Sequence, residues 1–412
     1  MNTSTQPNGL RAFLEGEMLI LSNYFHPEPT GSAPPISDLA AWAGENGFRP
    51  DVITARPSYP FSEVYSGYED GQKDADAYHG ARVRRVASFI PRSRGLIGRL
   101  VGELSFALAA LAGRKRRYNG VVCVCPSIFV VFFAPFFRKK AGRVVVIVHD
   151  IQSGLAQSLK FKGAGPILSV LRVFEAWSLN RCDHLVALTA EMAGELRKLG
   201  VHRPIDILPP QVDVREIVPQ PEPAGQTPIL LYSGNLGRKQ GLDQILTLAR
   251  SLMDRHIPAV VHVRGRGSER AELEAEAQKM ALTNVHFSDL ADRDQISVAL
   301  GEAALHLVPQ DPAGARFALP SKVFSIMAAR RAFVATADPG SPLGNVADAS
   351  GGGVCVPAKN PEAFADAIQT LLNDKALREE LGRAGREYVE REIDREIICR
   401  KLVALLIREP GS

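Results

Sequence analysis

Residues Ile229–Gly241 read Ile-Leu-Leu-Tyr-Ser-Gly-Asn-Leu-Gly-Arg-Lys-Gln-Gly, and the segment Leu242–Met253 follows them. The first four residues, Ile229–Tyr232, form a short apolar run that is typical of a buried strand. In the next segment apolar residues recur at helical spacing, which predicts a helix with one buried face: Leu242, Ile245, Leu246, Ala249 and Leu252. The glycines therefore lie in a turn that joins a strand to a helix.

A turn of this kind is suited to bind an anion. It presents backbone N–H groups and the positive end of a helix dipole, and the absence of a Cβ at Gly234 and Gly237 lets a ligand approach. Arg238 and Lys239 add two full positive charges at the same place. We interpret the turn as the binding site for the diphosphate of an activated donor. The alternative is that the glycines only turn the chain and that the two cations are solvated.

Length and charge limit the class of protein. A chain of 412 residues exceeds the size at which a single core keeps growing, so two domains are expected. The net charge of +4 is mild and does not favour a nucleic-acid partner. The five cysteines form no Cys-x-x-Cys pair and no cleavable signal peptide is evident, which indicates reduced thiols and a cytoplasmic protein.

Strand and helix patterns alternate through both halves of the chain, which predicts an α/β protein with two Rossmann-like parallel-sheet domains. We expect the carboxyl edges of the two sheets to face each other across a cleft. The predicted limits are a leader over residues 1–16, an N-terminal domain over 17–215, a proline-rich linker over 216–228, a C-terminal domain over 229–390, and a final helix over 391–412 for which packing on the N-terminal domain is one option.

The N-terminal half also carries a membrane signal. Val121–Phe137 is almost wholly apolar and precedes three basic residues, yet Pro126 and Pro135 interrupt it. We interpret it as a buried strand followed by a short helix rather than as a membrane span. Basic runs at Arg114–Arg117 and Arg138–Lys140 flank apolar segments, so a peripheral contact with anionic lipid at the inner membrane face remains an open alternative to a solvated surface.

Several strings in the chain resemble a known family, the retaining family 4 glycosyltransferases of the GT-B fold, and among them the group that makes colanic acid and other exopolysaccharides. The similarity covers nearly the whole chain from Met18. It is carried by these strings in order: Ser22–Gly31, Ile36–Ala40, His149-Asp150, Ile207–Asp213, Tyr232–Asp243, Arg264–Leu273, Leu319–Met327 and Ala335–Gly344.

The resemblance implies a metal-independent transfer of a hexose-type sugar from a nucleotide diphosphate sugar, with retention and without a cofactor. It implies that the C-terminal domain binds the donor and that the N-terminal domain binds the acceptor, which in the exopolysaccharide group is a lipid-linked glycan. The catalytic residues implied are His149, Arg238 and Lys239. The donor-binding residues implied are Gly31, Ser32, Gly234, Asn235, Gly237, Arg264, Gly265, Pro320, Ser321 and Lys322.

The sequence departs from the family in an important place. Most members carry two glutamates, separated by seven residues, near the Met-Ala of the last binding helix. Two alignments are possible here, and neither supplies a carboxylate: one places Phe317 and Ser325 at these positions, and the other places Ala315 and Val323 there. Lys322 is a candidate to contact the phosphates instead.

Three hypotheses follow. The first is an active transferase of surface polysaccharide synthesis. The second, suggested by the missing glutamates, is a degenerate GT-B protein that acts as a partner or scaffold. The third is a nucleotide-sugar epimerase with a similar two-domain fold, which no particular feature of the sequence favours.

Overall fold

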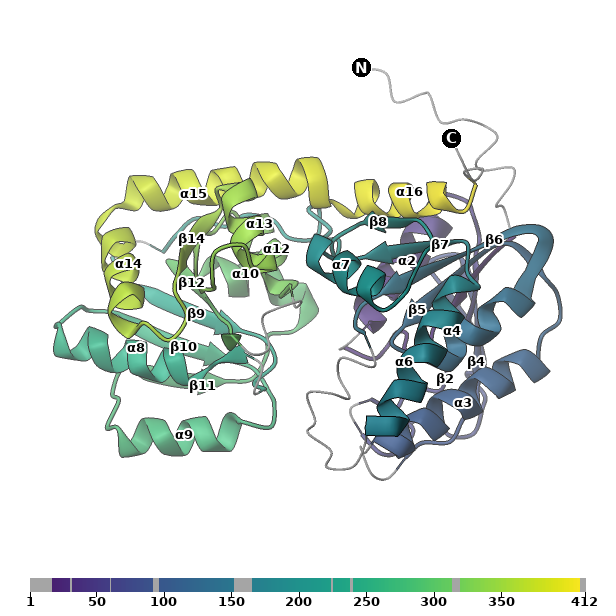
Figure 1. Ribbon diagram of the computed structural model, residues 1–412. Helices are drawn as coiled ribbons and strands as arrows, with labels where there is room; N and C mark the ends of the chain where they lie inside the picture. The colour runs from purple at the N-terminus through teal and green to yellow at the C-terminus, as the bar shows by residue number, and fades with distance from the viewer. Residues whose placement is uncertain are drawn as a thin grey trace, which may run out of the picture. The chain divides into compact units, whose positions relative to one another are not determined.

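The computed structural model describes residues 17–29, 32–59, 61–91, 96–151, 165–223, 225–237, 240–312 and 319–407. The chain folds into two compact units (Figure 1). The N-terminal unit comprises Met1–Pro209 together with Ile398–Ser412, and the C-terminal unit comprises Pro210–Ile397. Each unit is built on its own sheet, which confirms the predicted fold class of two α/β units.

The sheet of the N-terminal unit has the strand order β3-β4-β2-β1-β5-β6-β7-β8, and only the β3–β4 pair is antiparallel among the described strands. Its strands are β1 (Met18–Leu21), β2 (Asp51–Ala55), β3 (Ala75–Tyr78), β4 (Ala81–Val86), β5 (Tyr118–Cys125), β6 (Arg138–Val148), β7 (His184–Ala187) and β8 (Ile205–Ile207). Its helices are α2 (Ala33–Glu45), α3 (Leu96–Ala112), α4 (Ile128–Phe133), η1 (Ala134–Phe137), α6 (Gly165–Asn180), α7 (Ala190–Lys198) and α16 (Arg395–Leu405).

Helices cover both faces of this sheet (Figure 1). Side chains alternate along a strand, so Met18 and Ile20 of β1 belong to the core beneath α2, while Leu19 and Leu21 belong to the core beneath α3 and α4. The last helix, α16, adds Leu402 and other side chains to the same core as α2. The final helix of the chain thus closes one face of the N-terminal sheet.

The apolar segment Val121–Phe137 folds as predicted, with β5 followed by α4 and η1. Among the described residues, no helix combines the length and the apolar character that crossing a bilayer requires. The basic run at its end belongs to β6, which begins at Arg138; Arg138 pairs with Tyr118 of β5, and after an irregularity the pairing resumes at Arg143 with Gly120. Arg138 and Lys139 form ion pairs with Asp183 and Glu17, so this run contributes less positive surface than the sequence suggests.

The sheet of the C-terminal unit is wholly parallel in the described strands, with the order β11-β10-β9-β12-β13-β14. Its strands are β9 (Ile229–Ser233), β10 (Val260–Arg264), β11 (Val285–Ser288), β12 (Leu305–Pro309), β13 (Phe333–Thr336) and β14 (Gly353–Val356). Its helices are α8 (Asp243–Asp254), α9 (Arg270–Lys279), η3 (Arg293–Gln295), α10 (Ile296–Gly301), α12 (Lys322–Ala328), α13 (Pro342–Ser350), α14 (Pro361–Asn373), α15 (Lys375–Tyr388) and the π-helix η4 (Val389–Ile393).

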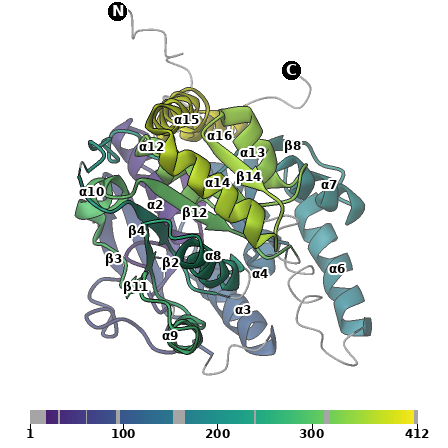
Figure 2. The ribbon, with the colours of Figure 1, turned by 90° about the vertical axis from the view of Figure 1, so that its left-hand side faces the viewer.

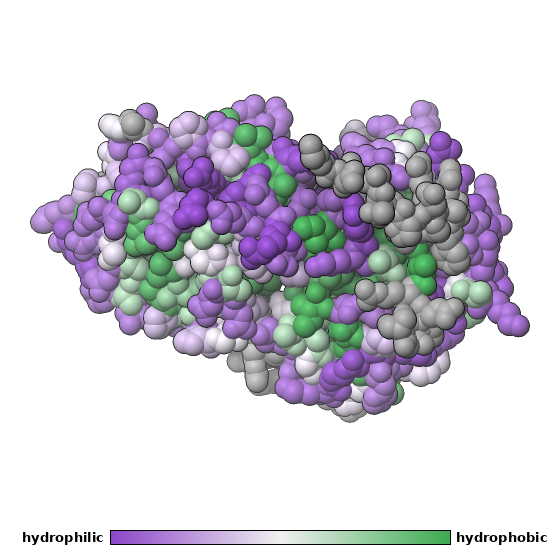
Figure 3. All heavy atoms as spheres, turned by 90° about the horizontal axis from the view of Figure 1, so that it is seen from above, coloured by the Kyte–Doolittle hydropathy of each residue, from purple (hydrophilic) through white to green (hydrophobic). Residues whose placement is uncertain are grey.

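The helix predicted after the glycine turn is α8, and all five apolar residues at helical spacing are buried against the sheet. Figure 2 shows α8 and α14 side by side on this face, with α9 below them. The opposite face is covered by α10, α12, α13 and η4. The outer side of α15 is hydrophilic (Figure 3), as its exposed glutamates and arginines require.

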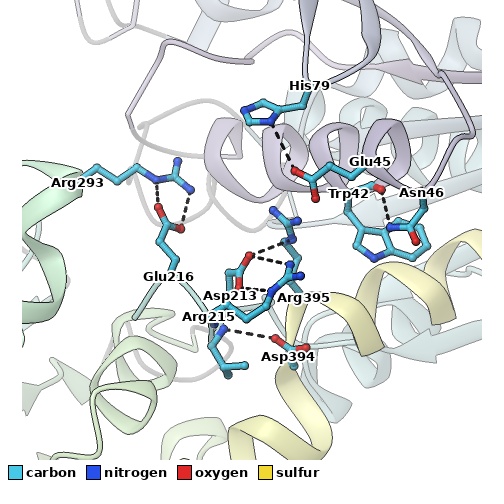
Figure 4. Close-up of polar contacts among 11 residues, drawn as sticks. Trp42, Glu45, Asn46, His79, Asp213, Arg215, Glu216, Arg293, Asp394 and Arg395 are labelled. Atoms are coloured by element: carbon cyan, nitrogen blue, oxygen red, sulfur yellow. Dashed lines mark hydrogen bonds and ion pairs between the residues drawn. The ribbon is translucent and has the colours of Figure 1, made fainter. Parts of the chain in front are cut away.

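The segments through which the chain enters and leaves the C-terminal unit are bound to each other (Figure 4). Val212 pairs with Asp394 in a parallel bridge, and the amide of Val214 donates to the Asp394 carboxylate over 3.3 Å. Asp213 accepts ion pairs from Arg215 at 3.2 Å and from Arg395 at 3.3 Å. Hydrogen bonds and ion pairs therefore hold these two segments together, and they are not independent linkers.

His306 in β12 is a buried histidine with a defined partner. Its Nε2 atom lies 3.0 Å from the carbonyl oxygen of Leu300 and donates to it. Burial lowers the pKa of His306 to about 3 despite this bond, and the cations Arg331, Arg264 and Lys322 act in the same direction as burial. The folded protein thus holds this imidazole neutral over the whole range in which an exposed histidine would titrate.

We predict that the unfolding free energy falls as pH falls below about 6.5, because the unfolded chain binds a proton at this histidine and the folded chain does not. The expected slope from His306 is about 1.4 kcal/mol per pH unit. Urea denaturation at several pH values between 7 and 5 measures it, with His306→Gln as the comparison. A variant that keeps the full wild-type slope would show that His306 is not the group responsible.

Candidate active site

The glycine turn at the end of β9 lies directly against the loop at the end of β10. The amide of Gly234 donates to the Arg264 carbonyl over 2.9 Å, and the amide of Leu236 donates to the Arg266 carbonyl over 2.9 Å. The two loops thus continue the pairing of their strands past the edge of the sheet. This pairing fixes the conformation of the turn.

Glycine is required in the β10 loop by this close approach. A Cβ added at Gly265 would lie 1.9 Å from the carbonyl oxygen of Gly234, and one at Gly267 would lie 2.1 Å from the carbonyl oxygen of Leu236. Both distances are shorter than any real contact, so a side chain at either place would push the loops apart. Gly265 therefore supports the turn through backbone packing, whatever it does for a donor.

Lys322 brings a buried positive charge to the turn. It is the first residue of α12, and its Nζ atom lies 3.6 Å from the centroid of the Tyr232 ring. A Cβ at Gly234 would lie 2.9 Å from the same Nζ atom, so glycine at this position makes room for the ammonium group. Among the described residues Nζ has no hydrogen-bond partner although it is shut off from solvent. Burial lowers the pKa of Lys322 to about 7.

The turn also offers unpaired donors. Within the part of the chain that the structure describes, the amides of Asn235 and Gly237 donate to no protein acceptor. The hydroxyl of Tyr232 donates to the Asn235 carbonyl over 2.7 Å and so holds the turn in place. Backbone N–H groups and a buried ammonium group that has no counter-ion among the described residues are together suited to bind an anion.

A buried glutamine secures the other side of the turn. Gln244, in the first turn of α8, donates through Nε2 to the carbonyls of Gly241 at 3.2 Å and Gln310 at 3.0 Å. Its Oε1 accepts from the amide of Lys359 at 2.9 Å. Gly241 has φ +61 and lies so close to Asp311 that a Cβ would be 2.8 Å from its amide nitrogen. Gln244 and Tyr232 were not among the predicted site residues; a buried amide one turn into a helix is the signal that could have found Gln244.

Arg264 is held inside the C-terminal unit. Its guanidinium group donates to the Ala299 carbonyl over 2.9 Å and forms an ion pair with Glu302. The residue is buried, so these bonds connect the end of β10 to α10. Binding of the donor by its side chain remains a prediction.

Pro320 and Ser321 lie just before α12. The Pro320 carbonyl accepts from the amide of Val323 over 3.1 Å, and Ser321 is exposed at the N-cap with no side-chain capping bond. No carboxylate occurs in α12, so Val323 and Ser325 leave both possible positions of the second family glutamate apolar or uncharged. Phe317 and Ala315 lie outside the described residues.

Of four further predicted site residues, three lie outside the described residues and one, Ser32, lies within them. Arg238, Lys239 and Gly31 lie outside the described residues, and their roles remain predictions. Ser32 is the N-cap residue of α2, where its carbonyl accepts from the amide of Ile36 over 3.3 Å and its side chain makes no capping bond.

His149 follows the last residue of β6 in the N-terminal unit. Its amide donates to the Cys125 carbonyl over 3.0 Å. Its Nε2 atom is buried and finds no hydrogen-bond partner among the described residues. Burial lowers the pKa of His149 to about 4. The imidazole is therefore neutral near pH 7 and can exchange a hydrogen bond with a sugar hydroxyl, but it supplies no positive charge. Contact with the sugar remains a prediction.

Two family descriptions match successive parts of the chain. Residues 30–211 match the glycosyl transferase 4-like domain, and residues 213–388 match the glycosyl transferases of group 1. WcaI of Escherichia coli K12, provisionally assigned as a colanic acid biosynthesis glycosyl transferase, is 28% identical over 94% of this chain and 98% of its own length.

Solved structures show the same fold at low sequence identity. Sucrose-phosphate synthase from Thermosynechococcus elongatus has a TM-score of 0.73 at 19% identity, over 94% of this chain and 98% of that chain. Anabaena HepE in complex with UDP and glucose has a TM-score of 0.69 at 12% identity, over 95% and 99%. These similarities show the GT-B fold. The two family matches, with the similarity to WcaI over 94% of the chain, show that the protein is a glycosyltransferase in which a glycosyl transferase 4-like domain is followed by a group 1 domain.

Proposed function

We propose that this glycosyltransferase moves a sugar from a nucleotide diphosphate sugar to a glycan acceptor in surface polysaccharide synthesis. The observation that carries the proposal is the Lys322 ammonium group at the Gly234 turn, which has no hydrogen-bond partner in the part of the chain that the structure describes. A diphosphate is the doubly charged ligand that would supply its missing partner. The similarity to WcaI supports a polysaccharide product, and the UDP complexes of structural relatives support a nucleotide sugar as donor.

The chemistry explains why cations are needed at this place. During transfer the bond between the anomeric carbon and a diphosphate oxygen breaks, and an acceptor oxygen takes the place of the diphosphate. Negative charge grows on the departing diphosphate, so fixed cations stabilise the transition state more than the bound donor. We assign this task to Lys322 together with Arg238 and Lys239. In the N-terminal unit, His149 would contact the transferred sugar, and Gly31 and Ser32 would approach the donor phosphate and the acceptor.

The proposal includes a lipid-linked glycan as acceptor, as in the exopolysaccharide group that the sequence resembles. A degenerate protein without turnover remains the second candidate, because α12 has no carboxylate at the position of the family glutamate. Calorimetry with UDP, GDP and dTDP separates the two. Binding of one nucleotide is expected of the enzyme, and no binding at millimolar concentration would favour the scaffold.

Removal of any one cation should slow the reaction. A charge-assisted hydrogen bond contributes about 1.5–3 kcal/mol, so Arg238→Ala, Lys239→Ala and Lys322→Ala should each lower kcat/KM by roughly 10- to 100-fold. Steady-state kinetics with the donor found by calorimetry measures this. Lys279→Ala is the matched control, because Lys279 is an exposed lysine on α9 that pairs with Glu276. Wild-type turnover in the Lys322 variant would remove Lys322 from the site.

Donor affinity should also depend on pH. Lys322 loses its proton near pH 7 in the free protein, whereas a bound diphosphate would raise its pKa and keep it charged. Binding therefore takes up a proton above about pH 7, and affinity should fall roughly 20- to 30-fold between about pH 6.5 and about pH 8.5. Calorimetry with an intact UDP-sugar, which does not itself titrate in this range, measures the trend. Lys322→Gln should bind more weakly with a flat profile; a wild-type profile that is equally flat would contradict the assignment.

Retention and independence of metal complete the proposal. Three protein cations at the diphosphate can carry the charge for which other transferases use a metal ion. We expect EDTA to leave the initial rate unchanged, and NMR of the first product formed should show the anomeric configuration of the donor. Inversion of the configuration, or loss of activity that Mg²⁺ or Mn²⁺ restores, would refute this part.

A further inference from the structure

Helix α6 of the N-terminal unit carries apolar side chains on its exposed side as well as on its buried side, where Leu171 and Leu179 lie. Val170, Val173 and Trp177, spaced three and four residues apart, are exposed by 69%, 71% and 49%. The opposite side of the same helix buries Glu175 and Ser178 almost completely. A surface helix normally turns its apolar stripe to the core. Here an apolar stripe faces outward, and such a patch indicates a contact surface.

Aromatic rings extend this stripe. Phe132 of α4 packs against Trp177 with ring centroids 5.2 Å apart, and it also contacts Phe136 of η1 at 6.5 Å. The guanidinium group of Arg181 lies over three of these rings, 4.9 Å from Phe132, 5.0 Å from Trp177 and 5.6 Å from Phe136. We call Val170, Val173, Trp177, Phe132, Phe136 and Arg181 the outer α6 face.

The helices around this face carry no exposed negative charge. Helix α4 packs against both α3 and α6 (Figures 1 and 2). The only acidic residues of α3 and α6 are Glu103 and Glu175, both buried, and α4 and η1 have none. Exposed cations are present, with Arg172 on α6 and Lys115 after α3. Ile97 of α3 is also an exposed apolar side chain, at 78%.

We propose that the outer α6 face docks on an anionic lipid surface, with Trp177 and the two valines in the headgroup region. Apolar and aromatic side chains with arginines and without carboxylates are what such a surface binds. Arg181, whose guanidinium group lies over these rings, would bind a lipid phosphate group beside them. The role of this contact rests on the proposed function, since it would bring the acceptor-binding unit to a lipid-linked glycan.

A second copy of the chain is a poorer occupant of this face. A symmetric dimer pairs the same patch with itself, so Arg172 and Arg181 of one copy would meet the same cations of the other. No exposed carboxylate on the described residues of α3, α4, η1 and α6 is available to offset that repulsion. An anionic lipid surface supplies the missing negative charge.

The chain provides its own reporter for the test. It has two tryptophans, and Trp42 is buried in the core while Trp177 is half exposed on the proposed surface. Vesicles that contain phosphatidylglycerol should shift the tryptophan emission of the whole protein to shorter wavelength, and brominated lipid should quench it. The Trp177→Phe variant should show neither change. If bound protein shows no quenching, the contact is not made by this face.

Flotation with the same vesicles measures the strength of the contact. The triple variant Val170→Asn/Val173→Asn/Trp177→Gln should partition at least about 10-fold less. The Arg172→Gln variant should partition onto the vesicles about 5-fold less than the wild type at low salt. At high salt the difference should be small, because salt screens the contribution of the arginine. Val298→Asn is the matched control, since Val298 is a valine exposed by 58% on α10 of the C-terminal unit, and it should bind as the wild type does.

Three results would overturn the proposal: unchanged binding of the triple variant, an equal loss in the control, or binding of the wild type to phosphatidylcholine vesicles as strong as to anionic ones. Sedimentation that shows a wild-type dimer dissociated by the triple variant, without an effect on vesicles, would assign the face to a second copy instead. Thermal melting confirms that each variant folds. Calorimetry with UDP in the absence of lipid measures binding at the donor site alone. Its result therefore distinguishes failure of the lipid contact from failure of the proposed transfer reaction.

Discussion

The buried ammonium group of Lys322 has an aromatic ring for a neighbour and, among the described residues, no anion. A cation over a ring gains about 0.5–2 kcal/mol, which is far less than a buried charge needs. The lowered pKa of Lys322 is the consequence of this imbalance. A fold that keeps such a group does so at some cost in stability, and an anionic ligand at the same place removes that cost. We therefore interpret the position of the Lys322 ammonium group over the Tyr232 ring as that of a ligand-binding group rather than of a structural contact.

The parts around Lys322 serve to keep the turn rigid. The β9 and β10 loops hydrogen-bond to each other beyond the sheet, and glycines allow their backbones to touch. Gln244 fixes the start of α8 to the loop after β12. Because the protein itself supplies both partners of these bonds, the donors of the turn do not have to reorganise when charge develops on a leaving group. Charge is arranged differently in the N-terminal unit, where the imidazole of His149 is kept neutral.

The sequence predicted those features that depend on local periodicity. The apolar run of β9 and the helical spacing in α8 gave the right elements and the right buried face, and the interrupted apolar segment at Val121–Phe137 gave a strand and a helix. The short antiparallel strand β3 could not be predicted from periodicity, because its side chains are mostly exposed and show no alternation. The strand β6 begins earlier than its apolar part suggests, since its basic residues are paired by carboxylates of other segments.

The sequence could not predict features that arise from packing between distant segments. Gly265 resembles a ligand-binding glycine, yet the structure requires a glycine there because another loop lies against it. Lys322 is separated from Gly234 by a large part of the C-terminal unit, and only the fold brings the two together. The apolar stripe of α6 would be placed in the core on periodicity alone. Its exposure becomes evident only because α4 and α3 cover the side of α6 that carries Glu175 and Leu171.

A crystal structure of the chain with UDP tests the central claim most directly. The account predicts that an oxygen of the diphosphate lies about 3 Å from Nζ of Lys322 and accepts a hydrogen bond from the amide of Asn235 or Gly237. A diphosphate bound elsewhere, with Lys322 still unpaired on the ring of Tyr232, would contradict it.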